Sequence, residues 1–157
     1  KHRMMASQIE KRHAMVDHAL LTDAGEFSPA VFTLIKPVLD QGNVLVFCTH
    51  STVAQALHAS LSQRVYPATL VTGATPKQVK ADAVKSFIED AFPSILIGTA
   101  TLATGTDGLD KVCDTLLILD DTDDDALRRQ LIGRILPRGA DTDASRKRIF
   151  RLNLTVA

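Results

Sequence analysis

The chain has 157 residues, a mass of 17.0 kDa, 45% apolar and 23% charged residues, which fits one compact domain and excludes two. Eighteen basic side chains balance 18 acidic ones, and this neutrality excludes binding to nucleic acid or to an acidic membrane by bulk charge alone. The sequence shows neither an apolar run of about 18 residues nor a secretory leader, so we expect an intracellular protein.

The first 27 residues are predicted to form a helical linker or N-terminal extension, because helix formers fill the opening stretch and a loop follows it. The chain begins with Lys1, and we expect it to be a piece of a longer protein. The main domain is predicted to run from residue 28 to residue 157.

A helix is predicted to begin at Ser28 and Pro29, since an N-cap residue followed by proline is typical of a helix start. Pro37 is expected to kink or end it. Its predicted inner face follows helical spacing: Val31, Leu34, Ile35 and Val38.

Beyond residue 43, short apolar runs alternate with stretches of helical spacing. The runs predict strands at 44–47, 69–71, 95–97, 112–119 and 149–156. The predicted inner faces of the helices are Val53, Leu57 and Leu61; Val79, Ala83, Phe87 and Ala91; and Leu127, Leu131 and Ile135. The last two helices are each preceded by a capping box, Thr75 to Gln78 and Thr122 to Asp125.

This alternation is what βαβ units produce, and continuous apolar strands are typical of a parallel sheet covered on both faces. The sequence therefore predicts an α/β fold, an open parallel sheet with helices on both faces. In such a sheet, ligands bind beyond the carboxyl ends of the strands. The residues that follow the first three runs are mostly small and hydroxylic, and they suit phosphate oxygens or, alternatively, ordinary helix capping.

The fourth run ends in Asp120 and Asp121, as a Walker B strand does. The sequence contains no G-x-x-x-x-G-K-[ST] loop, so we interpret these aspartates as a polar turn before a helix. The last helix carries Gln130 and Arg134 one turn apart, with Arg138 beyond them. Two guanidinium groups and an amide at the edge of the domain could bind a phosphate that a neighbouring domain brings. Alternatively, the basic residues simply complement the dipole at the end of the helix.

Four segments in order resemble the motifs of the second RecA-like domain, the helicase C-terminal domain, of superfamily 2 helicases and translocases. The resemblance covers about residues 43 to 150. It rests on motif IV at Asn43 to Ser51, a glycine-started helix from Gly73 with a basic residue at Lys80, motif V at Ile97 to Asp107, and the Q-x-x-G-R of motif VI at Gln130 to Arg134.

The resemblance implies that ATP, with Mg²⁺, is held mainly by an N-terminal RecA-like domain of the same polypeptide. It implies arginine fingers at Arg134 and Arg138 with Gln130 beside them, and nucleotide-side contacts at Gly105 and Asp107. It implies contacts to the backbone of a nucleic acid, with DNA favoured over RNA by the glutamine that opens motif VI. The residues implied to make these backbone contacts are Thr49, His50, Ser51, Gly73, Thr99 and Thr101. The chain alone is then expected to be inactive.

One residue departs from the family pattern: the last arginine of motif VI is expected at Pro137 but stands one residue later, at Arg138. This leaves a non-catalytic regulatory or partner-binding module of the same fold as the alternative. A further alternative is a small-molecule enzyme that uses Cys48 as a nucleophile. We expect instead that Cys48 and Cys113 are reduced core thiols, and no metal site is predicted.

Overall fold

The computed structural model describes residues 20–90, 94–104, 108–135 and 147–152. A five-stranded sheet in the order β2-β3-β1-β4-β5 lies at its centre, and every neighbouring pair of strands is parallel. The strands are β1 Val44–Cys48, β2 Ala68–Val71, β3 Ile95–Gly98, β4 Thr115–Asp120 and β5 Arg148–Arg151. The helices are α3 Pro29–Leu39, α4 Ser51–Gln63, α5 Lys77–Asp90, α6 Leu109–Val112 and α7 Asp125–Ile135, with a 3₁₀ turn, η2, at Ala100–Ala103.

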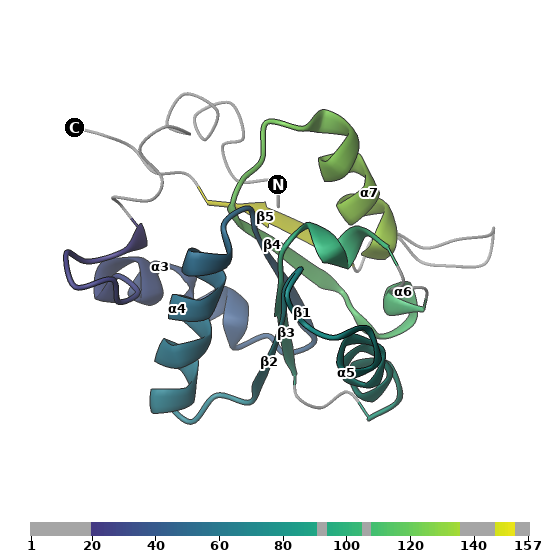
Figure 1. Ribbon diagram of the computed structural model, residues 1–157, viewed down its shortest axis with the longest axis horizontal. Coiled ribbons are helices and arrows are strands. Elements are labelled where there is room, and N and C mark those ends of the chain that lie inside the picture. The colour runs from purple at the N-terminus through teal and green to yellow at the C-terminus, as the bar shows by residue number, and fades with distance from the viewer. Residues whose placement is uncertain (1–19, 91–93, 105–107, 136–146, 153–157) are drawn as a thin grey trace.

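Helices cover both faces of the sheet (Figure 1). Helices α3 and α4 pack on one face with Val44, Val46 and Cys48 of β1, and α5, α6 and α7 pack on the other with Leu45 and Phe47. Strands β1, β3 and β4 are buried along their whole lengths. The predicted α/β fold is confirmed, because the sheet is parallel and helices cover both of its faces.

The inner faces of two helices differ from the predicted stripes. Leu34 of α3 and Val79 of α5 are each 53% exposed. Phe32 and Val84 are buried in their helices, and neither belongs to the predicted stripe. A helix can present several overlapping sets of apolar positions, and here the positions that reach the sheet, among them the bulky Phe32, decide which set is buried.

The predicted strand at 112–119 was too long. Leu109–Val112 forms α6, and β4 begins only at Thr115. Val112 and Cys113 are apolar and were counted with the run that follows, although Asp114 interrupts that run and Val112 is the last residue of α6. Pro37 lies inside α3, which runs on to Leu39.

Side-chain caps mark the starts of α3 and α7, whereas α4 and α6 begin without one. The Ser28 hydroxyl accepts the amide of Val31 at 3.3 Å, so the predicted cap of α3 is confirmed. For α7 the predicted capping box is wrong, because the carboxylate of Asp124 accepts the amide of Leu127 at 3.0 Å. The Thr122 hydroxyl accepts the amide of Asp124 instead, at 3.1 Å.

Residues 20–27 pack against the main domain. Leu20 and Phe27 are buried in the core on the α3 and α4 side, and Leu21 forms an antiparallel bridge with Phe27. The last residues of the predicted N-terminal extension therefore contribute to the core. None of the helices in the part of the chain that the structure describes is long and apolar enough to cross a membrane.

Candidate functional site

The sheet order brings the predicted strand-end residues to one edge. Strands β2, β3, β1 and β4 are consecutive neighbours, so the loops that leave their carboxyl ends are neighbours too (Figure 1). These loops carry Gly73 after β2, Thr99 and Thr101 after β3, and Thr49, His50 and Ser51 after β1. The structure therefore places the six predicted nucleic-acid-binding residues at one edge of the sheet.

The six residues differ in how far they face solvent. Gly73, His50 and Ser51 are exposed, and Thr101 is half-buried. Thr99 is only 8% exposed. The hydroxyl of Thr49 lies 2.8 Å from the carbonyl oxygen of Asp120 and 2.7 Å from that of Asp121, so its hydrogen is used within the chain.

The end of β1 is joined to the end of β4 through a buried carboxylate. Asp120 is completely buried, and its Oδ2 accepts the amide of His50 at 2.8 Å and lies 2.9 Å from the Nδ1 atom of the same residue. The imidazole itself stays 46% exposed. The carboxylate therefore fixes the orientation of the ring while leaving part of the ring accessible at the edge.

A buried ion-pair cluster lies beside this junction, and the sequence analysis missed it. The carboxylate of Asp121 accepts Arg128 Nε of α7 at 3.2 Å and Arg151 Nη2 of β5 at 2.5 Å. Asp120 and Asp121 were predicted to form a polar turn, but Asp120 ends β4 and both side chains are buried. The spacing of seven residues between Asp121 and Arg128, close to two helical turns, is only a weak signal that the two side chains are in contact. Nothing in the sequence pointed to Arg151.

Arg134, the predicted arginine finger, lies near the carboxyl end of α7 and is half-buried. Its Nε donates to the carbonyl oxygen of Ala103 at 2.9 Å, and its Nη2 donates to the same oxygen. Arg134 therefore contacts the turn that follows β3. Gln130 is exposed one helical turn earlier.

Lys80 of α5 reaches the same turn from another side. Its ammonium group donates to the carbonyl oxygens of Thr101 at 2.6 Å and Thr104 at 2.8 Å. Burial, and to a lesser extent the charge of Arg134, lowers the pKa of Lys80 from its ordinary 10.5. Three predicted residues, Gly105, Asp107 and Arg138, lie outside the described residues.

Neither cysteine is placed to act as a nucleophile. Cys48 and Cys113 are free thiols with no exposed surface. Burial raises the pKa of Cys48 well above 9.0, with a smaller contribution from the charge of Asp120, and burial raises the pKa of Cys113 to about 12. Since the thiolate is the reactive form, the structure argues against the nucleophile alternative. The described residues also contain no group of three or more His, Cys, Asp or Glu that could hold a metal.

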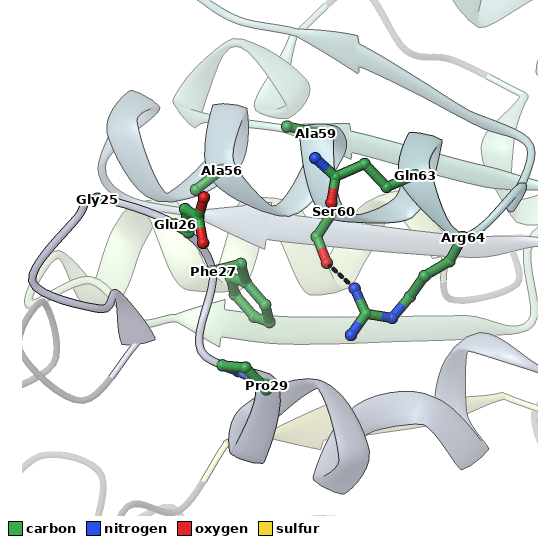
Figure 2. A pocket seen from close by; sticks show the side chains of 9 residues that line it. All are labelled: Gly25, Glu26, Phe27, Pro29, Ala56, Ala59, Ser60, Gln63 and Arg64. Atoms are coloured by element: carbon green, nitrogen blue, oxygen red, sulfur yellow. Dashed lines mark hydrogen bonds between the residues drawn. The ribbon is translucent and has the colours of Figure 1, made fainter.

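A pocket of about 360 Å³ lies away from the strand-end edge, between α4 and the segment that leads into α3 (Figure 2). Its lining residues are Gly25, Glu26, Phe27, Pro29, Ala56, Ala59, Ser60, Gln63 and Arg64. Arg64 donates to the Ser60 hydroxyl at 2.6 Å and lies 4.1 Å from the centre of the Phe32 ring. These contacts hold the C-terminal end of α4 against α3, and none of the predicted site residues lines the pocket.

The five-stranded parallel sheet, its order and the side chains at its carboxyl edge define a RecA-like α/β domain. The family model described as "Helicase conserved C-terminal domain" matches residues 30–139. The chain therefore belongs to this family and is the second RecA-like domain of a superfamily 2 helicase or ATPase. The family uses ATP, and its domains bind nucleic acid and partner domains.

Solved structures with the same fold include the C-terminal part of the Fun30 ATPase domain, at 22% identity and a TM-score of 0.63. That match covers 78% of this chain and 38% of the Fun30 chain. The C-terminal domain of the DEAD-box protein Dbp5 matches at 18% identity and a TM-score of 0.60, covering 79% of this chain and 69% of that chain. A third match is the S. cerevisiae Dbp5 L327V C-terminal domain bound to Gle1 H337R and IP6, at 19% identity and a TM-score of 0.61. It covers 78% of this chain and 68% of that chain. A search of the curated proteins finds no match.

Proposed function

We propose that the chain is the second motor domain of an ATP-dependent helicase or translocase that acts on nucleic acid, with DNA as the preferred polymer. In this proposal residues 28–157 form the motor domain, and an N-terminal RecA-like domain of the same polypeptide binds ATP and Mg²⁺. The position of Arg134 carries the proposal. Its guanidinium lies at the carboxyl edge of the sheet, half-buried, on a neutral peptide carbonyl.

The Ala103 carbonyl, one acceptor of Arg134, can be exchanged for a stronger one. A phosphate adds its own negative charge and can accept two parallel bonds from a guanidinium, whereas a peptide carbonyl is a neutral acceptor. A phosphate brought to this edge by a neighbouring domain therefore competes with the Ala103 carbonyl for the same donors. The exposed amide of Gln130, one turn earlier on α7, can donate to the same ligand. Bound ATP supplies the phosphoryl group that is transferred, and Arg134 stabilises the charge that develops on it.

The residues proposed to grip the nucleic acid are the exposed members of the carboxyl edge. Backbone amides, hydroxyls and helix starts hydrogen-bond phosphate oxygens, so a neutral domain can hold a strand without a strongly basic surface. Gly73, His50 and Ser51 face solvent on adjacent loops. We propose that Thr49 and Thr99 shape these loops and that Thr101 contacts the strand. Gly105 and Asp107 on the nucleotide side, and Arg138 as a second finger, complete the proposed set.

The test is Arg134→Ala in a protein that joins this chain to an ATP-binding RecA-like domain. Loss of an arginine finger lowers turnover by about 10³ to 10⁵-fold, so ATPase activity should collapse while ATP binding is retained. The matched control is Arg129→Ala, which removes an exposed arginine from the same helix and should leave turnover unchanged. Equal turnover in Arg134→Ala and the parent would remove Arg134 from the catalytic site and favour the non-catalytic module.

A second experiment addresses the isolated chain and the polymer. The 157-residue chain alone should show no ATPase activity, because the phosphate-binding loop lies elsewhere. Robust nucleic-acid-stimulated turnover by this chain alone would contradict the proposal. Competition between single-stranded DNA and RNA of the same sequence tests the preferred polymer, and tighter binding of RNA would overturn the choice of DNA.

A further inference from the structure

Lys80 directs its charge into the protein, although a lysine that contacts phosphate would suit a neutral domain that binds nucleic acid. Its Nζ atom lies 2.6 Å from the Thr101 carbonyl oxygen and 2.8 Å from the Thr104 carbonyl oxygen. These two acceptors flank the Ala103 carbonyl that receives Arg134. One lysine and one arginine, from helices on the same face of the sheet, thus bind three carbonyls of one short segment.

The turn needs this support because its own hydrogen bonds are weak at its C-terminal end. The first bond of η2, from the amide of Leu102 to the Thr99 carbonyl, is 2.9 Å long, but the last, from the amide of Thr104 to the Thr101 carbonyl, is 3.5 Å. Good N–H···O bonds lie between about 2.7 and 3.2 Å. The carbonyls at the end of a helical turn lack partners within it, and cations stabilise that end.

The other side of the turn is fixed by packing. Leu102 is completely buried, and its side chain lies directly over the Cα atom of Gly98, so that a Cβ placed there would lie 2.5 Å from Leu102 Cγ. The carbonyl side of the turn is held by polar contacts from side chains. Lys80 supplies two of them, to the carbonyls of Thr101 and Thr104 on either side of Ala103.

We propose that Lys80 is a positioning residue that holds the Ala100–Ala103 turn closed and thereby fixes the carbonyl on which Arg134 docks. Lys80 acts through the main chain of this turn and does not contact a nucleic-acid phosphate. The inference rests on the proposed function only where it connects the turn to the finger. The contacts that carry it are complete within this chain.

The test compares Lys80→Met, Lys80→Arg and the matched control Lys85→Met, which removes an exposed lysine from the same helix. Amide hydrogen exchange is measured on the 157-residue chain by NMR. Lys80→Met should speed exchange at Leu102, Thr104 and the Nε–H of Arg134 by about tenfold or more, the effect of losing charge-assisted hydrogen bonds. Exchange in β1 should stay unchanged, which shows that the fold is intact.

Lys80→Arg should restore slow exchange, because a guanidinium fork can also donate to two carbonyls. Unchanged exchange in Lys80→Met, or exchange in Lys80→Arg as fast as in Lys80→Met, would overturn the proposal. Lys85→Met should exchange at the same rate as the parent. Faster exchange of the turn in this control would also overturn the proposal, since the loss of any lysine from α5 would then loosen the turn.

Binding of a single-stranded oligonucleotide separates this inference from the proposed function. If Lys80 holds the turn, Lys80→Met should keep the same slope of log affinity against log salt as the parent. A slope smaller by about one would identify Lys80 as a phosphate contact and overturn the inference. If the parent chain binds no oligonucleotide, the nucleic-acid part of the proposed function fails, while the exchange results still decide the role of Lys80.

Discussion

The two halves of the carboxyl edge are held together in different ways. At the ends of β4 and β5, the buried carboxylate of Asp121 lies between Arg128 and Arg151, whose side chains are only 12% and 10% exposed. At the end of β3, Lys80 and Arg134 bind main-chain carbonyls in half-buried positions. A buried ion pair is costly to break, because one charge is left without its partner, whereas Arg134 can exchange a neutral carbonyl for another acceptor and leave no buried charge behind. The edge therefore combines a permanent junction with an exchangeable one.

The largest expected effect comes from breaking the permanent junction. Asp121→Ala removes the buried carboxylate that Arg128 and Arg151 share, and this should lower the free energy of unfolding by about 3 to 5 kcal/mol. Urea denaturation of the 157-residue chain measures the loss. The control is Asp125→Asn. Asp125 also pairs with Arg128, but its side chain is 72% exposed, so this substitution should lower the free energy of unfolding by at most about 1 kcal/mol. Equal losses in the two variants would show that burial of Asp121 contributes nothing.

Two glycines should respond to alanine with opposite signs. Gly98→Ala forces a Cβ to within 2.5 Å of the buried Leu102, and overpacking of this kind costs about 1 to 3 kcal/mol. Gly133 lies inside α7, and a Cβ added there would meet no described atom outside its own helix backbone within 4 Å. Gly133→Ala should therefore stabilise the chain by about 0.5 to 1 kcal/mol. Thermal and urea unfolding measure both, and a destabilised Gly133→Ala or a neutral Gly98→Ala would contradict the packing around these two glycines.

The smallest effect concerns the titration of Lys80 at the exchangeable junction. Because its pKa is lowered by burial and by Arg134, Lys80 should lose its proton at a pH below its ordinary 10.5. Carbon-13 NMR of the lysine Cε atoms measures the titration. Arg134→Met should move the pKa of Lys80 back toward 10.5 only in part, since burial is the larger cause. A complete return would reverse that order of causes, and no change would show that the charge of Arg134 contributes nothing.

The same shift has a consequence for stability. With a folded pKa below 10.5, the unfolded chain binds more protons than the folded chain between the two values. The free energy of unfolding should therefore rise with pH across that interval, and this rise should be absent in Lys80→Met. Urea midpoints of the parent and of Lys80→Met, measured at matched pH values, test this prediction. A parent midpoint that falls relative to that of the variant as the pH rises would contradict it.

The fold was predictable because its signals are local and repeated. Each buried strand is a continuous apolar run, and the cap at Ser28 marks the start of α3 correctly. The errors arose where one pattern fits two structures. Val112 and Cys113 are apolar and could extend the strand, yet Val112 ends α6, and α3 has more than one set of apolar positions that could face the sheet.

The candidate site was predictable at the level of loops and not of contacts. The motifs located the strand ends and Arg134, since position along the chain decides which loops lie at the carboxyl edge. They gave no sign that Arg151 pairs with Asp121, because those residues are 30 positions apart and meet only through the pairing of β4 with β5. Nor did they show that Lys80 faces inward, which depends on how α5 is rotated against η2.

The sheet order also constrains how the chain can fold during synthesis. Within the described part of the chain, the central strand β1 pairs with β3 and β4 alone, and β2 pairs with β3 alone. Until β3, Ile95–Gly98, has left the ribosome, β1 and β2 have emerged but the strands they pair with, β3 and β4, have not. Contacts between such distant segments form slowly and leave unpaired strand edges exposed to other chains. A nascent chain that stalls before residue 95 is therefore a natural substrate for chaperones.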